Sequence, residues 1–90
     1  MAVEVRLPTV LRTHAGASVV RVDGATIGEV LAKLVAEYPG MSGQVLTDDG
    51  SLHKFVNVYV DDDDVRYLQG LDTPVPDRAE VSILPAVAGG

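Results

Sequence analysis

The residues of this 90-residue chain that are best suited to take part in a reaction are its last two, Gly89 and Gly90. A carboxylate that must enter another protein's active site needs a thin, pliable stalk, and glycine combines the lack of a side chain with free access to positive φ. A frayed terminus is the alternative, since last residues are often disordered. The run before the glycines, Ala86, Val87 and Ala88, is apolar and uncharged, which favours the first interpretation. We therefore predict that the Gly90 carboxylate is the reactive group.

Pro85 marks the expected boundary between a folded domain at residues 1–85 and a flexible tail at residues 86–90. Proline has no backbone N–H, so strand pairing is expected to end there. Five extended residues reach roughly 17 Å at ~3.3 Å per residue. Such a tail is long enough to enter a partner's active site, and we expect Pro85 to be inserted together with it.

Other chemistry-bearing residues are few. Cysteine is absent, which excludes disulfides, thiolate metal sites and a thiol nucleophile. His14 and His53 are far apart and belong to no ligand cluster, and the acidic run 61–64 lacks the spacing of a Ca²⁺-binding loop. No glycine-rich phosphate-binding motif occurs. We expect no catalytic residue, no metal site and no bound cofactor.

Composition limits the partners. Seven Lys and Arg against 13 Asp and Glu give a net charge of -6, which disfavours binding to nucleic acid and to anionic membranes. No apolar run approaches the ~18 residues of a spanning helix, and Glu4 and Arg6 interrupt the region where a signal peptide would be apolar. With 47% hydrophobic residues the chain can bury one core, so we expect a single cytoplasmic domain.

The first part of the sequence predicts two strands. Residues 2–7 alternate apolar and polar side chains, as in a half-buried strand, and Pro8 ends the pattern. Turn residues at 14–18 precede a second strand at 18–22. We expect these strands to form a hairpin.

A helix is expected to begin at Thr26, because Thr26 and Glu29 have the spacing of a capping box. Pro39 and Gly40 are expected to end it. The apolar residues between them recur at intervals of three and four and form one stripe: Ile27, Val30, Leu31, Leu34, Val35 and Tyr38.

Further strands are expected at residues 55–60, 65–68 and 80–84, whereas residues 41–46 are ambiguous. In the first of these, the valines at 56, 58 and 60 are assigned to the core. Phe55 and Tyr59 then lie on the opposite face.

These elements favour an α+β roll, in which one main helix packs across one face of a mixed sheet. The other face would be partly open and would carry Phe55 and Tyr59 as a docking surface for a partner. The alternative, that loops cover both aromatic side chains, is equally compatible with the sequence.

Four segments resemble the ubiquitin-like β-grasp sulfur-carrier proteins of the ThiS and MoaD type, and within them the CysO-type carriers of cysteine biosynthesis. They are residues 8–12 (PTVLR), 52–60 (LHKFVNVYV), 64–66 (DVR) and 83–90 (ILPAVAGG). The last segment is fairly specific, whereas the others mainly reflect shared core and turns. The resemblance extends along nearly the whole chain.

The resemblance implies a mechanism. An ATP-dependent adenylyltransferase of the ubiquitin-activating type would convert the Gly90 carboxylate into an acyl-adenylate, and a sulfur donor would displace AMP to leave a thiocarboxylate. In the CysO-type pathway, this sulfur attacks an activated serine derivative on a PLP-dependent cysteine synthase, and a metallopeptidase frees the cysteine. The chain would be a co-substrate and not an enzyme.

One segment departs from the family pattern. Where the family commonly has Asp-Gly-Asp before the last strand, this chain has Arg at position 78. A left-handed conformation would cost a non-glycine residue roughly 1 kcal/mol or more. We therefore expect a different turn type there.

Three other functions stay open at the level of sequence. The sulfur acceptor could be a molybdopterin precursor, a thiazole or a secondary metabolite. The chain could instead be a ubiquitin-like modifier joined to lysines of other proteins. It could also be an adaptor that uses only its sheet face.

Overall fold

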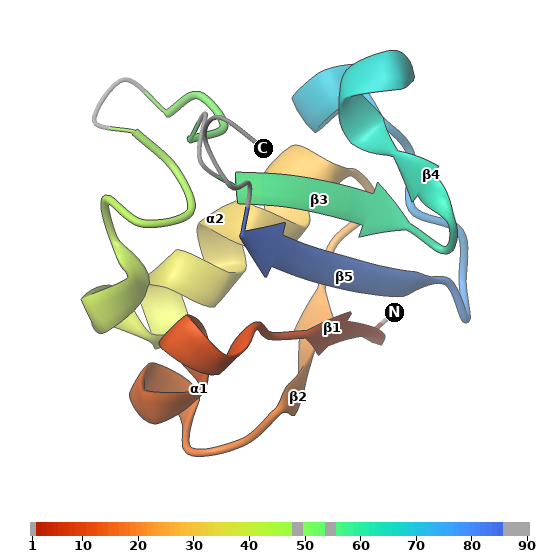
Figure 1. The fold of residues 1–90 in the computed structure, drawn as a ribbon. Helices are drawn as coiled ribbons and strands as arrows, with labels where there is room; N and C mark the ends of the chain where they lie inside the picture. The colour runs from red at the N-terminus through yellow and green to blue at the C-terminus, as the bar shows by residue number, and fades with distance from the viewer. Residues whose placement is uncertain (1, 48–49, 54–55, 86–90) are drawn as a thin grey trace.

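The computed structural model describes residues 2–47, 50–53 and 56–85 of the chain. In this part, a five-stranded mixed sheet is covered on one face by one main helix (Figure 1), which confirms the predicted β-grasp roll. The elements are β1 (Ala2–Arg6), α1 (Thr9–Ala15), β2 (Val19–Asp23), α2 (Ile27–Glu37), β3 (Val56–Val60), β4 (Asp63–Asp64) and β5 (Glu80–Pro85), with short 3₁₀ helices η1 (Pro39–Met41), η2 (Val65–Tyr67) and η3 (Gly70–Asp72).

The strand order in the sheet is β2-β1-β5-β3-β4. β1 and β2 form the predicted antiparallel hairpin. β5, the last strand in sequence, lies between β1 and β3 (Figure 1). It runs parallel to β1 and antiparallel to β3. The end of the described chain is therefore held in the middle of the sheet.

The core lies between the sheet and α2. Val56, Val58 and Val60 of β3 are buried, as their alternation predicted. The predicted stripe of α2 is confirmed, since Ile27, Val30, Leu31 and Leu34 are fully buried and Val35 and Tyr38 are partly buried. Full burial of a Leu or Ile side chain contributes about 1.5–3 kcal/mol, so packing, more than helix propensity, stabilises α2.

The predicted capping box at the start of α2 is present with one difference. The Thr26 hydroxyl accepts from the Glu29 N–H at 3.3 Å, as expected. The Glu29 carboxylate accepts from the N–H of Ala25 at 3.1 Å, whereas in a capping box it accepts from the amide of the N-cap residue, which here is Thr26. Thr26 also belongs to a β-bridge with Pro74, which ties the start of α2 to the segment before β5.

Helix α1 was not predicted. Pro8 stands at its N-cap, and Gly16 ends it in the left-handed region at φ 74°. Proline is common at the start of a helix, and glycine is common just past its end. With only seven residues, α1 is too short to be stable alone, and it depends on packing Leu11, which is 2% exposed.

The strand predicted at residues 65–68 is wrong. Residues 65–67 form the 3₁₀ helix η2, in which the Asp64 side chain accepts from the Arg66 N–H at 2.9 Å. The Arg66 guanidinium reaches back over the sheet, donating to Asn57 Oδ1 and, at 2.9 Å, to the carbonyl of His53. These long-range contacts favour the turn over continued strand pairing.

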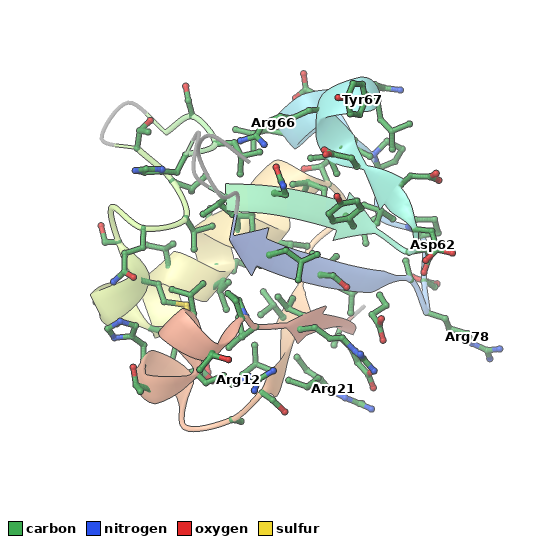
Figure 2. All side chains as sticks on the ribbon, in the orientation of Figure 1. Arg12, Arg21, Asp62, Arg66, Tyr67 and Arg78 are labelled. Atoms are coloured by element: carbon green, nitrogen blue, oxygen red, sulfur yellow. The ribbon has the colours of Figure 1, made fainter. Side chains whose placement is uncertain are left out.

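The expectation for Arg78 is also wrong. Arg78 adopts the left-handed conformation at φ 70° although it is not glycine. The turn before β5 thus keeps the backbone geometry that glycine would adopt more easily, and the arginine side chain points away from the sheet (Figure 2).

Within the described residues, no helix is long and apolar enough to cross a membrane.

Candidate functional site

The site is the end of the sheet where β5 finishes. The register of β5 pairs Val5 with Val81 on the β1 side and Val58 with Ile83 on the β3 side. Val81 and Ile83 are 0% and 1% exposed. Because both edges of β5 are paired and its inner face is buried, the strand cannot slide along its neighbours. Whatever follows Pro85 therefore starts from a fixed point.

The face of the sheet opposite α2 carries a mixed surface that extends from Leu84 toward the start of β5. Tyr59 and Ser82 are half-buried, and Leu84 is 46% exposed. Together with Asp61 and Asp62 they line a shallow pocket. This face thus combines an aromatic ring, an aliphatic side chain and hydrogen-bonding groups, a combination that suits protein contacts.

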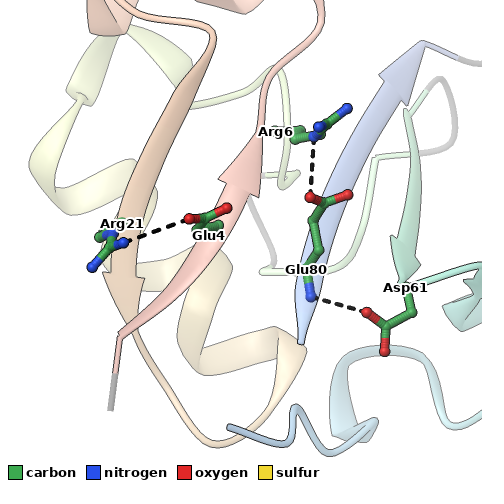
Figure 3. Close-up of polar contacts among 5 residues, drawn as sticks. All are labelled: Glu4, Arg6, Arg21, Asp61 and Glu80. Carbon is green, nitrogen blue, oxygen red and sulfur yellow. Dashed lines mark hydrogen bonds and ion pairs between the residues drawn. The ribbon is translucent and has the colours of Figure 1, made fainter. Parts of the chain in front are cut away.

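Polar contacts across the strands order the rest of this face (Figure 3). Arg6 Nε lies 3.1 Å from Glu80 Oε2, and Arg21 Nη2 lies 3.5 Å from Glu4 Oε1. The Asp61 carboxylate accepts from the Glu80 N–H at 3.1 Å. Surface ion pairs of this kind contribute at most about 1 kcal/mol each, so they order side chains more than they stabilise the fold.

The predicted site residues are only partly within the described chain. Pro85 is the last residue of β5 and pairs with Val56, so β5 extends one residue beyond the predicted strand. Tyr59 lies in β3 on the face opposite the helix, as the alternation predicted. Phe55 and the predicted tail residues Ala86, Val87, Ala88, Gly89 and Gly90 lie outside the described residues. Their assigned roles stay predictions.

Within the described residues, neither histidine lies in a cluster of potential metal ligands. His14 Nε2 lies 3.1 Å from Gln44 Nε2, and His53 uses its backbone to contact Val45 and Arg66. Residues 2–47, 50–53 and 56–85 contain no group of three or more potential ligands among His, Asp and Glu. In the acidic run, Asp61 and Asp64 each accept from a backbone N–H, which gives them a structural role.

A second hollow, at the end of the sheet where β5 finishes, was not predicted from the sequence. Arg12 Nε donates to the carbonyl of Leu7 at 3.0 Å, which fixes its guanidinium beside the end of β1 (Figure 2). Arg12 lines this hollow with Pro8 and Leu84, among other residues. The sequence signal was present, because residues 8–12 form one of the family-like segments, but only the parallel pairing of β1 with β5 brings Arg12 near Leu84.

The sequence matches the ThiS family over residues 5–90. The chain belongs to the ThiS family. It is 47% identical to the sulfur carrier protein CysO of Mycobacterium tuberculosis over 93 residues, covering 100% of both chains. Its structure is similar to CysO in the crystal structure of the Amycolatopsis orientalis BexX/CysO complex, with a TM-score of 0.88, 43% identity, and 99% and 100% of the two chains covered.

ThiS-family membership does not separate sulfur carriers from protein modifiers. The chain is also 43% identical to small archaeal modifier protein 3 of Haloferax volcanii over 68 residues, or 76% of this chain and 73% of that protein. The family assignment thus fixes the fold and leaves the fate of the C-terminal group to be argued.

Proposed function

We propose that this protein is a sulfur carrier whose Gly90 carboxylate is converted into a thiocarboxylate for cysteine biosynthesis. The observation that carries the proposal is the full-length similarity to CysO, which covers the Gly-Gly ending as well as the folded domain. The central position of β5 supports it, because the segment after Pro85 is presented from a rigid base. Rigid support of a reactive segment lowers the entropic cost of placing it in a partner's active site.

The proposed chemistry proceeds in two steps on a partner enzyme. A Gly90 carboxylate oxygen attacks the α-phosphorus of ATP and releases pyrophosphate, because a free carboxylate is a poor electrophile. A sulfur nucleophile then attacks the acyl carbon and releases AMP, which leaves a thiocarboxylate. Its sulfur would be nucleophilic, the property that a cysteine thiolate would otherwise supply.

In this scheme, the chain acts as a co-substrate in the cytoplasm and not as an enzyme. The acceptor would be an activated serine derivative on a PLP-dependent cysteine synthase, after which a metallopeptidase would release the cysteine. The carrier must therefore dock on several proteins in turn. The related CysO of Amycolatopsis orientalis forms a complex with BexX, which supports docking of this fold on a protein partner.

We propose Tyr59 and Leu84 as the docking face, together with Phe55, which lies outside the described residues. Leu84 directly precedes Pro85 in β5, and Tyr59 lies opposite Ser82 in the neighbouring strand β3. Both side chains are on the sheet face opposite α2. Aromatic and aliphatic side chains are the usual anchors of protein interfaces.

Protein modification is a second candidate, favoured by the similarity to the archaeal modifier. Both functions begin with the same activation, so they differ only in the product. Lys33 and Lys54 are the only lysines, so self-linked chains would have only these side chains as attachment points.

The test is to incubate the full chain with ATP, the host adenylating enzyme and sulfide, and to measure the intact mass of the C-terminal peptide. We expect one oxygen at Gly90 to be replaced by sulfur. A variant carrying one extra residue after Gly90 is the matched control and should stay unmodified. If the wild-type peptide is unchanged while the enzyme activates another carrier, the proposal fails. A ladder of conjugates in cell extracts, without thiocarboxylate, would support the modifier function.

A further inference from the structure

Arg12 is a cation whose charge the described chain leaves unmatched. Its Nε donates to the Leu7 carbonyl, a neutral acceptor. Among the described residues, the ion pairs are Arg6 with Glu80 and Arg21 with Glu4, and no carboxylate pairs with Arg12. In a chain with a net charge of -6, an arginine held in place without a carboxylate is positioned to meet an acidic group from outside.

The surface around Arg12 is mainly apolar, which limits the kind of partner segment that fits beside it. The other residues that line the hollow are the apolar Leu7, Pro8, Ile83 and Leu84 and the polar Arg6, Thr9 and Ser82. Arg6 differs from Arg12 in being paired with Glu80. Most of the exposed surface of the hollow is apolar, and Leu84 is 46% exposed. A hollow of this type accepts an aliphatic or aromatic side chain next to the group that pairs with the guanidinium.

The length of the chain beyond β5 places this hollow in contact with a partner. Five residues follow Pro85, and fully extended they span roughly 17 Å at ~3.3 Å per residue. When Gly90 reaches the reacting atoms in an adenylating enzyme, the end of β5 must lie within that distance of them. Leu84 and the hollow that it lines are then at the rim of the partner's active-site entrance.

We infer that the hollow beside Arg12 is a docking site for a segment of the adenylating enzyme that carries a carboxylate next to an apolar side chain. The carboxylate pairs with the Arg12 guanidinium, and the apolar side chain packs against Pro8 and Leu84. This inference rests on the proposed function. Arg12 is a positioning residue in it, because it touches neither ATP nor the acyl carbon.

The experiment measures ATP–pyrophosphate exchange by the adenylating enzyme at increasing concentrations of the full-length carrier. Arg12→Glu should raise the KM for the carrier about tenfold and leave kcat within about twofold, because a favourable charge contact becomes repulsive while Gly90 is unchanged. The KM of the wild type should rise with ionic strength. Arg12→Lys should keep most of the affinity.

Arg21→Glu is the matched control. Arg21 is also an exposed arginine, but it lies on the edge strand β2 and pairs with Glu4. Glu4 is in register with Glu80, the first residue of β5, so Arg21 is far from the end of β5 where the hollow lies. Its KM should stay within about twofold of the wild type. If Arg21→Glu and Arg12→Glu raise KM equally, overall charge explains the effect and the inference is wrong.

Two further outcomes are informative. If Arg12→Lys is as impaired as Arg12→Glu, the bond to the Leu7 carbonyl matters and not the charge, which overturns the inference. Binding of the enzyme to a carrier whose Gly90 carboxylate is converted to the neutral amide tests whether the chain's own C-terminal carboxylate is the partner of Arg12. The Arg12→Glu effect on Kd should persist in the amidated carrier, and its loss would contradict the inference. Absence of exchange with the wild type would instead refute the proposed function.

Discussion

Replacing Arg78 by glycine should stabilise the protein. Arg78 adopts φ 70° in the turn before β5, a region that L-residues with a Cβ rarely occupy. Its side chain is exposed and makes no hydrogen bond or ion pair within the described chain. The substitution therefore removes backbone strain without removing a contact seen in the structure.

Two opposing terms set the magnitude. A left-handed conformation costs a non-glycine residue about 1–2 kcal/mol. Glycine in turn raises the conformational entropy of the unfolded chain, which costs roughly 0.5–1 kcal/mol. The free energy of unfolding should thus rise by about 0.5–1 kcal/mol. For a domain of this size the Tm should rise by roughly 2–8 °C.

Urea unfolding followed by circular dichroism measures this change, and Arg78→Ala is the control. Alanine keeps the Cβ and the strain, so its free energy of unfolding should stay within about 0.5 kcal/mol of the wild type. Asp61 provides a contrast, because it also has positive φ, at 55°, but its carboxylate accepts from the Glu80 N–H. In Asp61→Gly, the lost hydrogen bond of about 1 kcal/mol should offset the relieved strain. A glycine at position 78 that lowers the free energy of unfolding would refute the reasoning.

Three other substitutions probe the fold. Thr26→Ala should lower the free energy of unfolding by about 1 kcal/mol through loss of the α2 cap, whereas Thr26→Ser should be nearly neutral; chemical denaturation compares them. Leu31→Ala should cost about 2–5 kcal/mol, because Leu31 is 0% exposed, and a Tm that hardly changes would contradict that packing. Gly40→Ala would place a Cβ 2.5 Å from His14 Nδ1, and because the exposed His14 ring can move away, it should cost at most about 1 kcal/mol. The cost should shrink when His14 is also replaced by alanine, and a double-mutant cycle with no coupling would argue against the contact.

The elements predicted correctly are those whose signal is local. The alternation in β1 and β3 assigned the buried valines, and the capping residues and apolar stripe located α2. These patterns depend on the period of a strand or a helix, which the sequence shows directly. Helix α1 was missed because it has only seven residues, and Leu11 is the strongly buried one among its described side chains. Two turns are too short for a clear periodic signal.

The candidate site was only partly predictable. The Gly89-Gly90 ending and Pro85 mark the tail in the sequence, and the roles given to them stay predictions because the tail lies outside the described residues. Tyr59 was correctly placed on the uncovered face by its position in the strand alternation. Arg12 was not recognised as part of a site, since its neighbour Leu84 lies far from it in the sequence.

The sequence by itself determined the period of each main element, the apolar faces and the family-like ending, because these follow from side-chain spacing along a single segment. Only the tertiary structure decided that β5 enters the sheet between β1 and β3. It also decided that Arg66 ties η2 to β3 and that Arg78 adopts a left-handed conformation. The position of β5 and the contacts of Arg66 depend on residues brought together by the fold, whose combined free energy overrides local preference.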